Sequence, residues 1–217
     1  EHAIKHDLDK FYNHPNSLFR YIENKRISVL IEEADIRDSS EVLEVGCGAG
    51  HILERISNGK LTGIDISPSQ IERARKRLGN KAELSVSKGE ALPFTDKSFD
   101  RILCTEVFEH VLEPEKILTE MKRVLRDDGL ISLSIPNEKL IILTKNILLN
   151  TGLRRVLEPK KSEWDLASKN NLDEWHIHKY DLNIIKQQAV KLFKILKIKR
   201  IPFYFIPFRY VLKLSKA

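Results

Sequence analysis

The sequence predicts an α/β protein with a seven-stranded, mostly parallel sheet, an antiparallel C-terminal edge, helices on both faces, and a partly helical insertion after the fifth strand. Three observations lead to this prediction. Short apolar runs alternate with segments of helical spacing as far as residue 137, the order typical of a parallel sheet with crossover helices. A run of glycines separates the first apolar run from its helix. Two further apolar runs close the chain.

The elements are expected in a simple order. A helix leads into the core, and five strands follow, separated by helices or turn residues. The closing runs 195–206 and 208–214 suit an antiparallel edge pair. The expected helices cover residues 17–34, 51–57, 70–78, 114–125, 139–149 and 182–193, and the expected parallel strands cover residues 41–45, 61–65, 82–86, 99–104 and 130–135.

Charge is distributed unevenly along the chain. Residues 1–137 hold 20 basic and 24 acidic side chains, net −4, whereas residues 138–217 hold 17 basic and 7 acidic side chains, net +10. The basic third suits an anionic lipid surface, a phosphorylated or carboxylated small molecule, or RNA, and equally a solvated face without a partner. No apolar stretch approaches the roughly 18–20 residues of a membrane span, and the first residues lack a signal-peptide core. We therefore expect a cytoplasmic protein.

The glycine-rich stretch EVGCGAG is the first candidate binding site. Gly46, Gly48 and Gly50 lie between a predicted strand and a helix, where backbone amides approach a ligand without side-chain obstruction. The third glycine of the dinucleotide-binding fingerprint is missing, which disfavours a nicotinamide cofactor. Asp65 ends the next predicted strand, where a carboxylate accepts hydrogen bonds from the ribose hydroxyls of an adenosine ligand.

Five segments follow one another along the middle of the chain: VLEVGCGAGHI, TGIDIS, ALPFTDKSFDRILC, TEVFEHVLEPEKILTEMKRVLRDDG and LISLSIPN. In their order and spacing they resemble the motifs of the class I S-adenosylmethionine-dependent methyltransferases. The resemblance covers about residues 40–137 and implies a Rossmann-like fold, methyl transfer and S-adenosylmethionine as the cofactor. The chain is similar to methyltransferases of the ubiquinone pathway and of glycan and lipid loci.

The resemblance also implies roles for single residues. The methionine end of the cofactor would meet the turn and the end of the fourth strand, and the ribose would meet Asp65. Many relatives place an adenine-binding Asp where this chain has Lys88, and a lysine accepts no hydrogen bond. We therefore expect Gly89 or Glu90 to contact the adenine amino group. The expected cofactor-binding residues are Glu44, Gly46, Cys47, Gly48, Gly50, Asp65, Ile66, Gly89, Glu90 and Thr105.

The chemistry is expected near the segment EVFEH. His110 is the first candidate catalytic residue, and His176, after the insertion, is the second. Glu106, Glu109 and His110 also resemble the motif by which small-RNA 2′-O-methyltransferases and ubiquinone-pathway O-methyltransferases hold a divalent metal ion. A catalytic or structural His110 without a metal is the favoured interpretation.

The same resemblance divides the chain into parts of a single domain, 1–217. These parts are a helical lead-in (1–40), the cofactor-binding core (41–137), a substrate-cap insertion (138–176), and a closing helix with edge strands (177–217).

The apolar insertion favours a small-molecule or lipid-like acceptor, with O-methylation preferred. An RNA methyltransferase and a non-catalytic cofactor-binding partner subunit are the alternatives, and nucleic acid is disfavoured because no RNA-binding module is recognised. The segment KRIPFYFIPFRY suggests a peripheral membrane contact, unless Phe203, Phe205 and Phe208 are buried in an edge strand.

Overall fold

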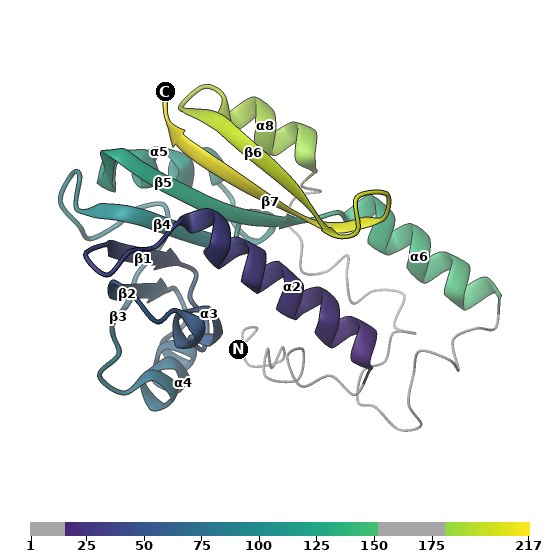
Figure 1. The fold of residues 1–217 in the computed structure, drawn as a ribbon, viewed down its shortest axis with the longest axis horizontal. Coiled ribbons are helices and arrows are strands. Elements are labelled where there is room, and N and C mark those ends of the chain that lie inside the picture. Colours follow the sequence, from purple (N-terminus) through teal and green to yellow (C-terminus); the bar gives the residue numbers. More distant parts are fainter. Residues whose placement is uncertain (1–15, 152–180) are drawn as a thin grey trace.

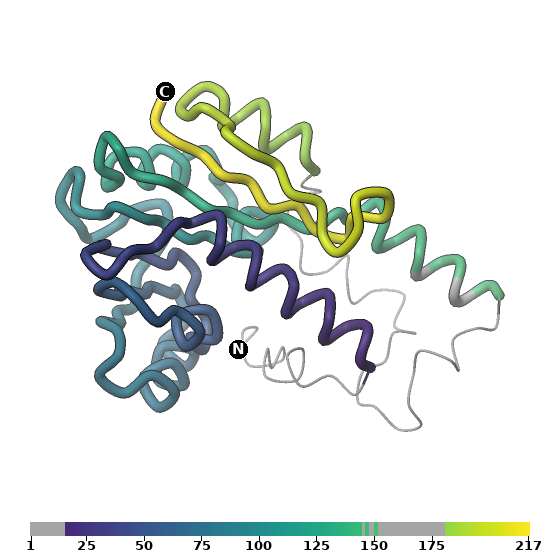
Figure 2. The backbone as a smooth tube through the Cα atoms, in the orientation of Figure 1, coloured from purple at the N-terminus to yellow at the C-terminus, as the bar shows by residue number. Residues whose placement is uncertain are grey.

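The computed structural model describes residues 16–151 and 181–217, and the coloured tube in Figure 2 follows this part of the chain. Its helices and strands agree closely with the expected order. The helices are α2 (Ser17–Ala34), α3 (His51–Arg55), α4 (Pro68–Leu78), α5 (Pro114–Val124), α6 (Glu138–Asn150) and α8 (Leu182–Ala189), with a 3₁₀ turn at Phe108–His110. The strands are β1 (Glu41–Val45), β2 (Lys60–Asp65), β3 (Ala82–Val86), β4 (Phe99–Thr105), β5 (Leu125–Pro136), β6 (Phe193–Pro202) and β7 (Pro207–Lys216).

The seven strands form one sheet in the order β3-β2-β1-β4-β5-β7-β6 (Figure 1). Strands β1 to β5 pair in parallel, and β7 is antiparallel to both β5 and β6. The predicted mostly parallel sheet with an antiparallel C-terminal edge is therefore confirmed. From β1 the strand order runs toward one edge of the sheet through β2 and β3, and from β4 it runs toward the other edge through β5. Open α/β sheets bind their ligands where the strand order reverses in this way, at the carboxyl ends of the strands.

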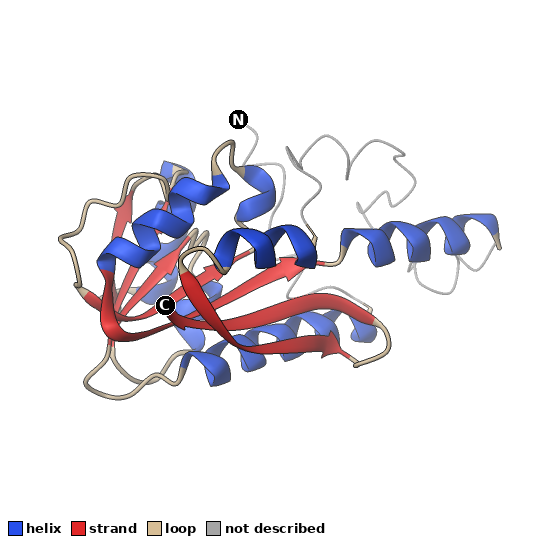
Figure 3. Cartoon of the chain, turned by 90° about the horizontal axis from the view of Figure 1, so that it is seen from above, coloured by secondary structure: helices blue, strands red, loops and turns tan. Residues whose placement is uncertain are grey.

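Helices cover both faces of the sheet (Figure 3), as predicted. On one face α5 and α8 pack on the strands through buried side chains such as Ile117, Met121 and Ile185. On the other face α2, α3 and α4 bury Leu30, Leu53 and others. Burial of two apolar faces between helices is the usual source of stability in this architecture. None of the helices in the described ranges is long and apolar enough to cross a membrane.

Two expected boundaries are wrong. Helix α8 ends at Ala189 rather than near Phe193, because Phe193 pairs with Lys216 as the first residue of β6 and buries its ring. Strand β5 begins at Leu125, five residues earlier than expected. In both cases β5 or β6 begins earlier than its apolar run predicts, because its first residues already pair with a neighbouring strand.

The turn between β6 and β7 corrects another expectation. Phe203 and Phe205 are not buried in an edge strand, because both lie in the turn that joins β6 to β7, outside the sheet. Their exposed fractions are 53% and 90%. Only Phe208, inside β7, is partly covered. The aromatic residues of this turn therefore lie on the surface.

Candidate functional site

The glycine turn follows β1 directly and takes a conformation that requires glycine. The amides of Gly46 and Cys47 donate to the carbonyl oxygen of Ile64 at 2.9 and 2.8 Å, which ties the turn to the end of β2. Gly46 has φ +75°, and a Cβ atom there would lie 2.4 Å from Cγ2 of Val107. Gly48 and Gly50 also have positive φ. The turn thus keeps its shape and its open backbone only with glycine.

Asp65 holds the glycine turn against the next loop. Its Oδ2 accepts from the amide of Gly48 and its Oδ1 from the amide of Ser67, both at 2.9 Å. Burial raises the pKa of this carboxyl, although the two amide donors lower it in part. A carboxylate has about four acceptor positions, so two amides leave room for a pair of ligand hydroxyls.

The far wall of the site comes from Ile66 and the loop after β3. Ile66 is an apolar side chain with an exposed fraction of 64%, next to Asp65. The amide of Ser87 donates to the carbonyl oxygen of Asp65 at 3.0 Å. A Cβ atom on Gly89 would lie 3.2 Å from Val45 and from Ile117, so this loop folds back to the end of β1. Glu90 is half-buried there and Lys88 is exposed.

Glu44 and Cys47 are buried beneath the turn. Burial raises the pKa of Glu44 well above its usual value, Arg26 opposes this rise and Asp65 adds to it. The Oε2 atom of Glu44 has no hydrogen-bond partner among the described residues. Burial also raises the pKa of the Cys47 thiol, which makes it an unreactive packing group.

Thr105 and Glu106 lie at the end of β4, beside the turn. The Thr105 hydroxyl is buried, without a hydrogen-bond partner in the described part of the chain. Glu106 has φ +53°, a strained conformation for a residue with a side chain. Two contacts hold its carboxylate: the Ser134 hydroxyl donates to Oε1 at 3.1 Å, and Arg209 Nε lies 3.1 Å from Oε2.

These contacts belong to a closed charged ring formed by Glu23, Arg26, Ser134, Glu106 and Arg209. Arg26 Nε donates to Glu23 at 2.9 Å and its Nη1 to the Ser134 hydroxyl at 3.3 Å. Arg209 Nη2 lies 3.3 Å from Glu23 Oε1 and closes the ring. Burial would raise the pKa of Glu23, but the two arginines bring it below its usual value. The ring therefore favours the charged form of the buried Glu23 carboxylate, which lies between two guanidinium groups.

The metal hypothesis finds no support in this geometry. Within residues 16–151 and 181–217, His, Cys, Asp and Glu side chains form no group of three or more that could hold a metal ion. Glu106 instead faces Arg209, while Glu109 is buried and its pKa is raised well above the usual value by burial and by Glu106. His110 Nε2 lies 4.0 Å from Glu109 Oε1, with the imidazole half-exposed.

The turn and the strand ends are predictable from the sequence, whereas the charged ring was not predicted. Glu23 and Arg26 are three residues apart on a helix, a spacing usually found on a solvated surface. Arg209 interrupts an apolar strand, and this was the available signal. Residues 152–180 lie outside the described residues, and they include His176 and the part of the predicted insertion 138–176 that follows residue 151.

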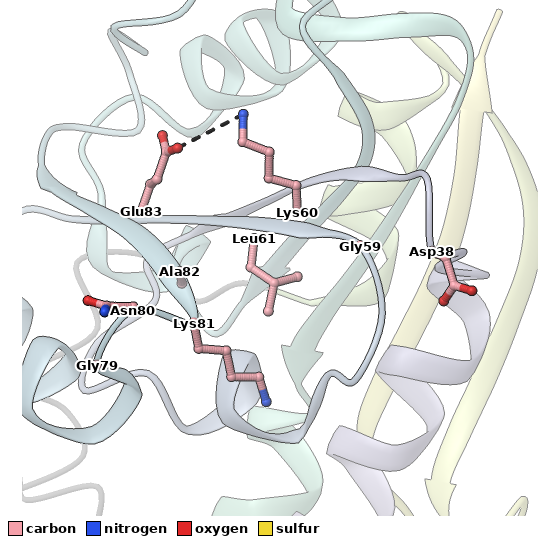
Figure 4. A pocket seen from close by; sticks show the side chains of 9 residues that line it. All are labelled: Asp38, Gly59, Lys60, Leu61, Gly79, Asn80, Lys81, Ala82 and Glu83. Atoms are coloured by element: carbon pink, nitrogen blue, oxygen red, sulfur yellow. Dashed lines mark ion pairs between the residues drawn. The ribbon is translucent and has the colours of Figure 1, made fainter.

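A different depression lies at the opposite edge of the sheet (Figure 4). It is open, has a volume of about 660 Å³, and lies at the amino ends of β2 and β3, where Lys60 faces Glu83 at 3.9 Å. No residue of the glycine turn or of the charged ring lines it. We therefore place the site at the carboxyl edge.

Comparisons with known proteins show which family the chain resembles. Residues 43–133 match a family described as a methyltransferase domain. The chain is 30% identical over 184 residues to the uncharacterized methyltransferase YcgJ of Bacillus subtilis, covering 79% of this chain and 72% of that protein. It is 31% identical over 135 residues to a ubiquinone biosynthesis O-methyltransferase of Pasteurella multocida, covering 53% of this chain and 54% of that protein. For several other curated relatives the chain spans between about a third and about half of their length.

A solved structure shares the fold. A Thermotoga maritima protein, titled a methyltransferase dependent on S-adenosylmethionine and a possible histamine N-methyltransferase, superposes with a TM-score of 0.69. The match covers 100% of this chain and 99% of that one, at 16% identity. Because it matches the methyltransferase domain family and is 30% identical to a methyltransferase that it covers to 72%, the chain belongs to the class I S-adenosylmethionine-dependent methyltransferases.

Proposed function

We propose that this chain transfers a methyl group from S-adenosylmethionine to an apolar small molecule or lipid-like acceptor, with a hydroxyl oxygen as the favoured nucleophile. The observation that carries the proposal is the pairing of the glycine turn with Asp65. Two amides hold this carboxylate in place, and it still has acceptor positions for a ribose.

The residues around the turn fit S-adenosylmethionine along its length. Backbone groups of Gly46, Cys47, Gly48, Gly50 and Thr105 would contact the methionine end, and the buried Glu44 would support the turn from below. Asp65 would bind the ribose hydroxyls. The exposed Ile66 would pack on the adenine, and Gly89 or Glu90 would meet its amino group in place of the exposed Lys88.

S-adenosylmethionine, when bound, would supply a methyl group on a positively charged sulfur, with a neutral thioether as the leaving group. The protein then has to align the acceptor, exclude water and receive the hydroxyl proton. His110 is the candidate proton acceptor, because its imidazole is half-exposed at the end of β4. His176 is the second candidate, and the insertion 138–176 would cap the acceptor.

Helix α6 supports an apolar acceptor. It directly follows β5 at the carboxyl edge of the sheet and leaves Leu143 and Ile147 exposed. The Pasteurella multocida relative is named for O-methylation in ubiquinone biosynthesis, which favours the same kind of acceptor and the same nucleophile.

Calorimetry with S-adenosylmethionine tests the cofactor part of the proposal. We expect binding by the wild type and a loss of affinity of at least about tenfold in Asp65→Ala, because hydrogen bonds to a charged group contribute about 1.5–3 kcal/mol. Asp38→Ala, which changes an exposed aspartate at the opposite edge, is the matched control. Equal affinities in Asp65→Ala and the wild type would refute the assignment.

The acceptor part is tested in the same preparation. The protein is incubated with cofactor labelled on its methyl group and with separated lipid, small-metabolite and RNA fractions. Label in the lipid or apolar metabolite fraction is the expected result. Label in RNA alone would reject a small-molecule acceptor while leaving the cofactor assignment intact.

A further inference from the structure

The hairpin of β6 and β7 combines two surface features that the cofactor site does not explain. The first is an apolar tip formed by residues 203–206, called here the hairpin tip. The exposed fractions of its members are 53% for Phe203, 66% for Tyr204, 90% for Phe205 and 50% for Ile206. Consecutive exposed aromatic and aliphatic side chains at the end of a hairpin cost solubility and usually mark a contact surface.

The second feature is charge. Residues 193–216 contain seven basic side chains and no acidic one. Some of the seven are neutralised within the protein, since Lys197 and Lys199 meet Glu33 and Arg209 belongs to the charged ring. Arg200 lies closest to the tip, with its guanidinium carbon 4.5 Å from the centre of the Tyr204 ring. An exposed cation beside exposed aromatic rings suits the boundary between lipid headgroups and acyl chains.

The hairpin tip lies at the same edge of the sheet as the cofactor site. Strand β7 is antiparallel to β5, and its register pairs Arg209 with Pro136, the last residue of β5. The residues before Pro207 therefore extend past the carboxyl ends of the parallel strands, as the loop beside α6 in Figure 1 shows. Arg209, three residues after the tip in β7, contacts Glu106 just past the end of β4.

Helix α6 and helix α2 extend this apolar surface. Asn137 fixes the start of α6 to the root of the hairpin, because its side-chain amide donates to the carbonyl oxygen of Pro207 at 2.8 Å. Its backbone amide donates to Phe208 at 2.9 Å. On α2, Tyr21 is exposed and its ring centre lies 6.4 Å from that of Phe203. Further along α6, Leu143 and Ile147 are also exposed.

We propose that the hairpin tip inserts into a bilayer that contains anionic lipid and holds the cofactor edge of the sheet against the membrane. The tip supplies apolar insertion, and the basic hairpin supplies attraction to anionic headgroups. The acceptor would then enter the site from the bilayer, and this step rests on the proposed function. The membrane contact itself depends only on the tip and its charges.

Sedimentation with vesicles tests the contact without any methyl transfer. The full chain is mixed with vesicles of phosphatidylcholine, with or without phosphatidylglycerol, at low and high salt. We expect binding to the anionic vesicles that salt weakens, and a reduction of about tenfold or more in Phe205→Asp. Val190→Asp, at the opposite end of β6 and also exposed, is the matched control and should bind as the wild type does.

Three results would overturn the proposal. The first is no binding of the wild type to either kind of vesicle, and the second is equal binding by Phe205→Asp. The third is that the tip contacts another partner. In that case Phe205→Asp would abolish self-association or binding to single-stranded RNA, and neither the wild type nor any variant would bind vesicles. Calorimetry with S-adenosylmethionine on Phe205→Asp separates this test from the proposed function, because the tip variant should keep the cofactor affinity of the wild type.

Discussion

The glycine turn and the charged ring lie at the same edge of the sheet but are built in opposite ways. The turn comes from consecutive residues, and its shape depends on the backbone conformation of Gly46, Gly48 and Gly50. The ring comes from residues up to 186 positions apart, from Glu23 to Arg209, and depends on side-chain charges.

This difference separates two ways of making a site rigid. Backbone geometry holds the turn at little electrostatic cost, through amide hydrogen bonds to the Ile64 carbonyl and the Asp65 carboxylate. Buried charges hold the ring, and such charges are stable only while every partner is present. The ring also fixes Glu106 in its positive-φ conformation and joins α2, β5 and β7 around the end of β4. We therefore expect damage to the ring to affect folding, and damage to the turn to affect binding.

The largest effect is expected from Arg26→Met. Removing this guanidinium leaves Glu23 buried with one partner instead of two, and loss of one member of a buried ion pair costs about 3–5 kcal/mol. Urea denaturation measures the free energy of unfolding. A loss below about 1 kcal/mol would show that the ring contributes no more than a surface pair.

The loss in Arg26→Met should also depend on pH. The pKa of Glu23 is lowered in the folded state, so its ionised form adds stability above its unfolded pKa of about 4.3. That stability is lost as pH falls through the folded pKa. The difference between variant and wild type should therefore shrink below about pH 4.3, and a constant difference would contradict this origin.

Gly46→Ala is expected to have a smaller effect, and mainly on the cofactor. A left-handed conformation costs a non-glycine residue about 1–2 kcal/mol, and the new Cβ atom would collide with Val107. We expect calorimetry to show a loss of affinity for S-adenosylmethionine of about tenfold or more. Adding Val107→Ala should restore part of the affinity, because it removes the collision but not the strain. Wild-type affinity in Gly46→Ala alone would refute this account.

The smallest effect is expected from Glu109→Gln. This variant tests whether the buried Glu109, near the ring, differs from Glu23 in being uncharged. Burial raises the pKa of Glu109 well above its usual value, which favours the protonated carboxyl in the folded state, and glutamine mimics that neutral form. We expect a stability change within about 1 kcal/mol at neutral pH. A carboxyl whose pKa is raised in the folded state lowers the free energy of unfolding as pH rises above about 4.3. The free energy of unfolding of Glu109→Gln should therefore increase relative to that of the wild type as pH rises. A pH-independent difference would argue that Glu109 is ionised.

The sequence predicts most of the fold and half of the site. The order of strands and helices, the antiparallel edge, the turn and Asp65 all follow from local patterns, since periodicity and glycine spacing reflect the conformation of neighbouring residues. The end of α8 and the start of β5 were misplaced, because pairing with β7 and β4 decides where these elements change. The exposure of Phe203 and Phe205 was not predictable from their apolar character.

What the sequence by itself determined is the order of the elements and the glycine turn, because a turn between a strand and a helix is set by a few adjacent residues. Only the tertiary structure decided that Arg209 holds Glu106 and that the aromatic hairpin tip lies at the edge of the sheet that carries the glycine turn. Both depend on the register of β7 against β5. That register is set by contacts between strands more than 70 residues apart, and no local pattern records it.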